Sequence, residues 1–141
     1  MTKARVLFLC TGNSARSQMA EALLREKAGD RFVAYSAGLD PHEVNPLAHR
    51  VMSEIGIDIS SQRAKSVAEY LGHIHFGYLI TVCDQALANC PIFPGVSRRL
   101  HWSLEDPAAV VGSEAERLAV FRRVRDELAT HVDEFIHENG S

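Results

Sequence analysis

Short apolar runs alternate with segments of helical periodicity along this chain, and this alternation constrains the fold more than any other feature. Four runs have the character of strands in a parallel sheet: residues 5–9, 31–36, 77–82 and 99–102. Parallel strands need long, right-handed crossovers between them. We therefore expect an α/β domain with a four-stranded parallel sheet, doubly wound, in the flavodoxin-like strand order 2-1-3-4.

Capping signals mark where several of the intervening helices begin. Asn45 followed by Pro46 is typical of a helix N-terminus. Ser113 and Glu116 have the spacing of a capping box and precede a long helical segment. The apolar residues of that segment keep a 3.6-residue period: Leu118, Phe121, Val124, Leu128, Val132 and Phe135.

The composition is that of one ordinary globular domain. The chain has 141 residues, of which 46% are hydrophobic and 23% charged, enough for a single core without disulfides. We therefore expect one domain over residues 1–141. A net charge of -3 gives no electrostatic signature of nucleic-acid or membrane binding. We expect a cytoplasmic monomer that binds neither nucleic acid nor a membrane.

The three cysteines each need an explanation, because an odd number argues against a framework of paired structural disulfides. Cys83 and Cys90 are not in a CxxC pair and have no evident fourth ligand for zinc, so we expect no metal site. They are either two core cysteines or a redox pair. The redox pair is favoured because Cys10 offers a thiol with which they can react.

Residues 10–17 form a Cys-x5-Arg-Ser sequence between a predicted strand and a predicted helix. Its small and polar residues allow backbone N–H groups to turn inward and bind a tetrahedral oxyanion at the helix N-terminus. The same donors should lower the pKa of the Cys10 thiol, while Ser17 can donate to the sulfur. Arg16 offers a planar fork for two oxygens. The predicted oxyanion-binding residues are Thr11, Gly12, Asn13, Ser14, Ala15, Arg16 and Ser17.

Cys10, Cys83 and Asp106 each follow a different predicted strand. Ligands of open α/β sheets bind beyond the carboxyl ends of the strands, so these residues should gather at one edge. Strands one and three are neighbours about 4.8 Å apart in the expected order, so Cys10 and Cys83 can meet. Pro107 keeps Asp106 extended, and its carboxyl can act as a general acid or cap a turn.

Four segments together resemble the thioredoxin-coupled arsenate reductases, which are built on the low-molecular-weight tyrosine phosphatase fold. They are CTGNSARSQMAE, the SAG of residues 36–38, VCDQALANCP and HWSLEDPA, and the resemblance covers nearly the whole chain. It implies that Cys10 attacks arsenate while Arg16 and the loop amides hold the oxyanion. It also implies that Asp106 protonates the departing oxygen.

The resemblance further implies a disulfide relay. Cys83 would attack Cys10, which releases arsenite and leaves a Cys10–Cys83 disulfide. Cys90 would then attack Cys83, and thioredoxin, the electron donor, would reduce the resulting Cys83–Cys90 disulfide. No tightly bound cofactor is implied.

Asn13, Glu21 and Ser36 match positions that shape the loop in this family and, in some members, bind a monovalent cation. Some members have an aspartate of that cation site where this chain has Lys65. An ammonium group there can replace the bound ion. We therefore expect no potassium requirement.

Two other functions compete with arsenate reduction. A low-molecular-weight protein tyrosine phosphatase would use the same loop, because phosphate and arsenate share shape and charge. Those enzymes usually have an aromatic residue after the Asp-Pro pair, where this chain has Ala108, and they have no use for Cys90. A non-catalytic oxyanion-binding or redox-sensing module is the third possibility, and it predicts binding without arsenite release.

Overall fold

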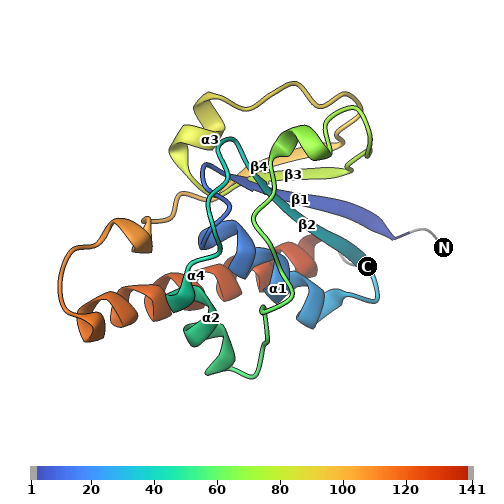
Figure 1. Ribbon diagram of the computed structural model, residues 1–141. Coiled ribbons are helices and arrows are strands. Elements are labelled where there is room, and N and C mark those ends of the chain that lie inside the picture. The colour runs from blue at the N-terminus through green and yellow to red at the C-terminus, as the bar shows by residue number, and fades with distance from the viewer. Residues whose placement is uncertain (1–2, 140–141) are drawn as a thin grey trace.

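The centre of the molecule is a sheet of four parallel strands. The computed structural model describes residues 3–139. Its strands are β1 (Ala4–Cys10), β2 (Phe32–Gly38), β3 (Tyr78–Thr81) and β4 (Arg98–His101). They lie in the order β2-β1-β3-β4, and every neighbouring pair is parallel (Figure 1). The predicted fold class and strand order are confirmed; β4 starts and ends one residue before the expected range.

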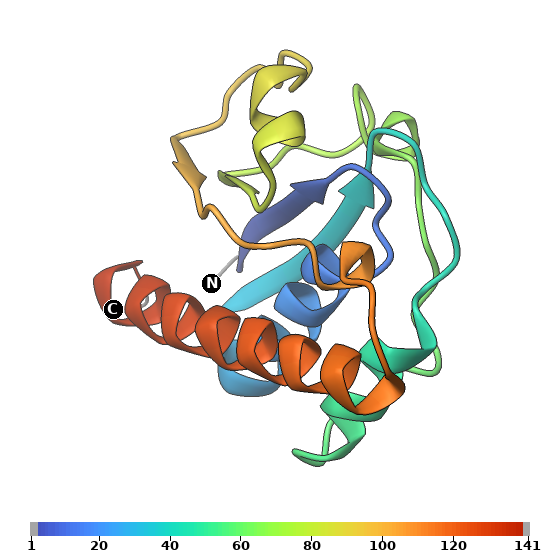
Figure 2. The ribbon, with the colours of Figure 1, turned by 90° about the vertical axis from the view of Figure 1, so that its left-hand side faces the viewer.

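Helices cover both faces of the sheet. The α-helices are α1 (Arg16–Ala28), α2 (Pro46–Ser53), α3 (Asp84–Ala88) and α4 (Glu114–Asn139), and the 3-10 helices are η1 (Val67–Glu69) and η2 (Pro107–Ala109). The long helices α1 and α4 lie on one face, with α2 beside α4, whereas α3 lies on the other (Figures 1 and 2). No helix within residues 3–139 combines the length and apolar character needed to cross a bilayer.

The helices begin where the capping signals predict. The Asn45 side chain accepts a hydrogen bond from the N–H of Leu47, 2.9 Å away, at the start of α2. Ser113 and Glu116 exchange side-chain to backbone hydrogen bonds of 3.1 and 3.3 Å at the start of α4, as a capping box requires.

The core forms between β1 and the two long helices. Four consecutive residues of β1, Val6 to Leu9, have no exposed surface, as expected for a central strand of a parallel sheet. Every residue of the apolar stripe predicted for α4 is buried. Trp102, just beyond β4, packs against Phe8 and stacks on His131 of α4, with ring centroids 5.7 and 5.0 Å away. These contacts fix the point from which the segment carrying Asp106 leaves the sheet.

Candidate active site

The turn between β1 and α1 is supported from outside by the segment of residues 39–45. Four carbonyls of the turn accept backbone hydrogen bonds from that segment: Cys10 from Leu39 (3.1 Å), Thr11 from Asp40, Gly12 from His42 and Ser14 from Asn45 (each 2.8 Å). The N–H of a trans peptide points opposite to its carbonyl. The N–H groups that follow these carbonyls are therefore directed to the inner side of the loop, where an oxyanion can accept from them.

Gly38 makes this close packing possible. A Cβ atom at Gly38 would lie 2.5 Å from the Thr11 carbonyl oxygen and 2.9 Å from the Asn13 nitrogen, both of them backbone atoms. A side chain at this position would push the loop away from β2. The sequence contains a signal for this contact, since Gly38 is the last residue of the SAG segment, but the sequence alone does not reveal its partner.

Cys10 is buried at the bottom of the loop, with 3% of its surface exposed. Its Sγ accepts a hydrogen bond from the Asn13 N–H at 3.1 Å and lies 2.9 Å from Ser17 Oγ. The Asn13 side-chain amide donates to Ser17 Oγ at 2.7 Å. Because Ser17 Oγ accepts that bond, its own hydrogen is available for the sulfur.

Burial raises the pKa of the Cys10 thiol above its ordinary value. The hydrogen bonds from Ser17 and the Asn13 N–H act in the opposite direction, and the nearby Cys83 raises the pKa further. The lowered pKa expected from the loop donors is therefore wrong for this structure, because the loop also removes the sulfur from water. The hydrogen bonds from Ser17 and the Asn13 N–H reduce the rise in pKa that burial causes, but they do not reverse it.

Asn13 has a left-handed backbone conformation, with φ of 49°, which asparagine tolerates better than most residues. The surrounding protein holds it there: its side-chain oxygen accepts from the Lys65 N–H at 2.8 Å, and its carbonyl accepts from Gln18 at 2.9 Å. Asn13 itself has no exposed surface. The loop conformation is thus fixed by buried polar contacts.

Arg16 and Asp106 lie together at the mouth of the loop. Arg16 begins α1, and its guanidinium donates to the Leu104 carbonyl at 2.9 Å and lies 3.7 Å from Asp106 Oδ2. The other oxygen of Asp106 accepts from the Ala108 N–H at 3.0 Å and caps η2. One carboxyl therefore caps a turn and still presents an oxygen toward Arg16 and the pocket.

Cys83 reaches the same pocket from the end of β3. It is 4% exposed and is the N-cap of α3, where its Sγ accepts from the Ala86 N–H at 3.3 Å. The Thr11 hydroxyl lies 3.4 Å from the same sulfur. A cavity of about 590 Å³ is lined by residues that include Cys10, Arg16, Cys83 and Asp106.

Cys90 does not line this cavity. It is half-buried in the segment after α3, and its thiol donates to the Pro91 carbonyl at 3.4 Å. All three cysteines are free thiols. The structure therefore brings two of the three predicted thiols to the loop and leaves the third outside it.

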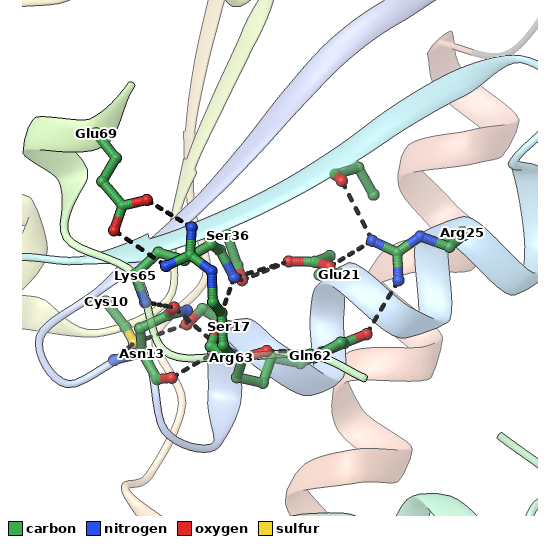
Figure 3. Close-up of polar contacts among 12 residues, drawn as sticks. Cys10, Asn13, Ser17, Glu21, Arg25, Ser36, Gln62, Arg63, Lys65 and Glu69 are labelled. Carbon is green, nitrogen blue, oxygen red and sulfur yellow. Dashed lines mark hydrogen bonds and ion pairs between the residues drawn. The ribbon is translucent and has the colours of Figure 1, made fainter. Parts of the chain in front are cut away.

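A buried charged cluster lies behind the loop (Figure 3). Ser36 donates to Glu21 at 2.6 Å, and the Lys65 ammonium donates to Ser36 at 3.3 Å and lies 3.6 Å from Glu21. Lys65 and Glu21 are only 8% and 5% exposed, and Arg25 forms a second ion pair with Glu21. Burial lowers the pKa of Lys65, and the Glu21 carboxylate opposes this shift.

Two glutamines that the sequence reasoning missed connect this cluster to the loop. Gln18, which has no exposed surface, donates to Asn13 and to the Arg63 carbonyl at 2.8 Å. Gln62 donates to the Gln18 side chain at 2.7 Å and accepts from Arg25. Among residues 3–139, no three histidine, cysteine or acidic side chains converge as metal ligands do.

Comparisons with known proteins match almost the whole chain. The profile of the low molecular weight phosphotyrosine protein phosphatase family matches residues 5–139. An arsenate reductase from Halalkalibacterium halodurans is 44% identical over 135 residues, which is 96% of each chain.

Two solved structures extend this similarity. An arsenate reductase in a phosphate-binding state is 30% identical, with a TM-score of 0.83 over 96% of this chain and 98% of that one. A thioredoxin-dependent arsenate reductase from Corynebacterium glutamicum is also 30% identical, with a TM-score of 0.63 over 93% of this chain and 62% of that one.

Proposed function

Because the chain belongs to the low molecular weight phosphotyrosine protein phosphatase family, we propose that it is an arsenate reductase built on the phosphatase site. The observation that carries the proposal is the second buried thiol in the oxyanion pocket: Cys83 lines the same cavity as Cys10, Arg16 and Asp106. A phosphatase needs Cys10, Arg16 and Asp106. A reductase also needs a second thiol that can break the bond between the Cys10 sulfur and arsenic. The arsenate reductases at 44% identity and at a TM-score of 0.83 support this choice.

Arsenate binds in the loop in the first step of the proposed reaction. The inward N–H groups and the Arg16 guanidinium hold its oxygens, and the arsenate oxyanion accepts the Cys10 proton as it enters. The Cys10 sulfur then forms a bond to arsenic, and the As–O bond opposite it breaks. Asp106 Oδ2, beside Arg16, gives its proton to the departing oxygen, which leaves as water.

Cys83 performs the reduction in the second step. Its thiolate attacks the Cys10 sulfur, an S–S bond forms, and the electron pair of the S–As bond stays on arsenic, which leaves as arsenite. Two electrons pass from the two thiols to arsenic, so the step needs no outside reductant. The position of Cys83 beside Thr11 of the loop supports this role, because the Cys83 sulfur must approach the Cys10 sulfur that carries arsenic.

Cys90 and thioredoxin regenerate the enzyme. The Cys90 thiolate attacks Cys83, Cys10 leaves as a thiolate, and the Cys83–Cys90 disulfide is then reduced by the thioredoxin dithiol. No tightly bound cofactor takes part. The thioredoxin dependence of the Corynebacterium glutamicum relative supports this choice of electron donor.

Hydrolysis of phosphomonoesters is a second candidate activity, favoured by the arrangement of Cys10, Arg16 and Asp106 around one cavity. That half-reaction needs neither Cys83 nor Cys90. Ala108, which lines the cavity beside Asp106, offers no aromatic surface on which a phenol ring can pack. We therefore expect this turnover to be slow and to be a side activity.

One coupled assay separates these functions. NADPH oxidation is followed with the protein, arsenate, thioredoxin and thioredoxin reductase, with Cys10→Ser as the control. An arsenate reductase consumes NADPH and releases arsenite in equal amounts, and the control is inactive. Hydrolysis of an aryl phosphate with no arsenate-dependent NADPH oxidation would establish a phosphatase instead. Arsenate binding with neither activity would establish a binding or sensing module.

A further inference from the structure

The imidazole of His101 bridges two side chains that flank Cys83 in the sequence. His101 is the last residue of β4 and lies opposite Thr81 of β3 in the register of the sheet. Its Nδ1 lies 2.7 Å from the Thr81 hydroxyl oxygen, and its Nε2 lies 3.0 Å from Asp84 Oδ1. Thr81 is two residues before Cys83, and Asp84 is the residue after it. One side chain of the neighbouring strand therefore contacts the chain on both sides of Cys83.

Hydrogen-bonding chemistry fixes the direction of both contacts. A carboxylate only accepts, so Nε2 of His101 carries a hydrogen and donates it to Asp84. In the neutral imidazole, Nδ1 is then an acceptor for the hydroxyl hydrogen of Thr81, a residue with 3% of its surface exposed. A buried hydroxyl therefore orients the ring so that its other nitrogen faces Asp84.

Asp84 is the residue at which α3 begins, and Cys83 is the N-cap of this helix. The hydroxyl of Ser103, in the segment after β4, donates to the same Asp84 oxygen at 3.3 Å. A helix of five residues is too short to be stable alone, so tertiary contacts decide whether it forms. His101 and Ser103 supply two such contacts, and both act on the first turn of α3.

The position of the Cys83 sulfur depends on that first turn. The sulfur accepts a hydrogen bond from the Ala86 N–H at 3.3 Å, a contact that requires the turn to be helical. Cys90 follows the far end of α3, and a disulfide needs Cα atoms about 4.4 to 6.8 Å apart. The turn that holds Cys83 at the loop must therefore open before Cys90 can reach Cys83.

We propose that His101 is a positioning residue: through Asp84 it holds the first turn of α3, and with it Cys83, in place for the first thiol exchange. In that exchange the Cys83–Cys10 bond forms, the S–As bond breaks, and its electron pair stays on arsenic. The same contact opposes the unwinding that the second exchange needs, in which Cys90 bonds to Cys83 and Cys10 leaves as a thiolate. This role rests on the relay proposed above.

The first test needs no arsenate. In full-length protein carrying Cys10→Ser, diamide oxidises the remaining two thiols, taking up two electrons and two protons as the Cys83–Cys90 disulfide forms. Adding His101→Asn should make this disulfide form about twofold to fivefold faster, because the shorter amide cannot reach Asp84. The effect is of the size expected for an exposed ion pair, since the Asp84 side chain is 82% exposed.

Matched variants show whether the contact with Asp84 is the cause. His101→Gln places an amide N–H near the position of Nε2, so it should keep most of the original rate. Asp84→Ala should accelerate disulfide formation as His101→Asn does, and the two changes together should add little to either one alone. His73→Asn, at an exposed histidine between η1 and β3, is the control and should leave the rate unchanged.

The second test measures the first exchange itself. In Cys90→Ser, single-turnover reactions with arsenate are quenched, and the Cys10–Cys83 disulfide is quantified by mass spectrometry. His101→Asn should slow its formation by about twofold to fivefold. The arsenate concentration that gives half the maximal rate should stay the same, because His101 acts on Cys83 and does not bind the oxyanion. His101→Gln should again keep most of the original rate.

Two results would overturn the proposal. One is a rate of Cys83–Cys90 formation with diamide that His101→Asn does not change. The other is an equal change in His101→Asn and His101→Gln, which would mean that the contact with Asp84 has no part in the effect. If the protein with His101 intact forms no disulfide with arsenate, the relay is wrong, and the diamide rates still decide whether His101 holds α3.

Discussion

The hydroxyl of Ser17 lies 2.9 Å from the Cys10 sulfur and is held in place by the Asn13 side chain on its other side. Asn13 in turn accepts from the backbone N–H of Lys65, whose ammonium lies 3.6 Å from Glu21. Ser17 is completely buried, so water cannot replace its hydrogen bond to the sulfur. Cys10, the proposed nucleophile, is therefore connected to the buried charged cluster through Ser17 and Asn13.

Removing this hydroxyl should make Cys10 less reactive at neutral pH. In Ser17→Ala, the pKa of the Cys10 thiol should rise further, because the hydrogen bond that lowers it is lost while burial still raises it. The thiolate fraction at a given pH then falls, so the pH profile of Cys10 alkylation should move to higher pH. Ser53→Ala, a change at an exposed position, is the control. An unchanged profile in Ser17→Ala would mean that the hydroxyl does not donate to the sulfur.

The buried Lys65 should make the protein insensitive to potassium. Its ammonium already lies beside Glu21 and Ser36, so a monovalent cation would meet a fixed positive charge there. The melting temperature and the activity should be equal in potassium and in a large organic cation. A saturable rise in melting temperature with potassium would contradict this expectation, since a ligand of the native state must stabilise it.

Lys65 should also contribute to stability. Lys65→Met should lower the free energy of unfolding by about 2 kcal/mol, because Glu21 stays buried with Arg25 as its remaining ionic partner. Lys27→Met removes a more exposed ion pair with Asp133 and should cost about 0 to 1 kcal/mol. Urea unfolding measures both. Equal effects of the two substitutions would show that the buried ion pair has no special role.

Glu54, at the end of α2, should make stability depend on acidity. It accepts hydrogen bonds from Arg122 and Arg125 of α4, and these bonds, with the charge of both arginines, lower its pKa from 4.5 to about 2. A lowered carboxyl pKa stabilises the native state fully above the unfolded value, and this contribution is lost as the pH falls from about 4.5 toward 2. Glu54→Gln should therefore be less stable than the wild type at pH 6.

The pH series tests the sign of this effect. The difference in urea midpoint between the wild type and Glu54→Gln should shrink as the pH falls from 6 to 3. The exposed Glu26 of α1 provides the control, and Glu26→Gln should follow the wild type. A difference that stays constant over this range would show that the ionised carboxylate contributes nothing.

Oxidation of Cys83 and Cys90 should unwind α3. The helix α3 lies between the two cysteines, since Cys83 caps its start and Cys90 follows its end, whereas a disulfide needs Cα atoms about 4.4 to 6.8 Å apart. In the reduced protein Asp84–Ala88 is helical, and the Leu87 N–H donates to the Cys83 carbonyl at 3.2 Å. Hydrogen exchange and proteolysis over residues 83–95 should increase on oxidation while β1 stays protected. Equal protection in both states would rule out the rearrangement.

The sequence predicts the parts of the site that topology alone positions. Parallel strands in the order 2-1-3-4 bring the ends of β1 and β3 together, so Cys10 and Cys83 line one cavity at that edge of the sheet. The strands and the capped helix starts follow from local patterns of apolar and capping residues. The placing of residues at the strand ends depends on the order of the strands in the sheet and little on the details of side-chain packing.

Other features of the site depend on tertiary contacts that a single sequence does not display. A glutamine in α1 would ordinarily be read as a surface residue, yet Gln18 is fully buried and holds Asn13. The loop is supported by backbone hydrogen bonds from residues 39–45, which no side-chain pattern encodes. The direction of the Cys10 pKa shift depends on burial, which becomes evident only in three dimensions.

The most direct test of the relay compares two activities in Cys90→Ser. With arsenate, this variant should release one equivalent of arsenite per protein and stop with the Cys10–Cys83 disulfide, identified by mass spectrometry. Slow hydrolysis of an aryl phosphate should continue in the reduced variant, since that reaction needs Cys10, Arg16 and Asp106 alone. Sustained arsenite release with thioredoxin, or parallel loss of both activities, would contradict the relay.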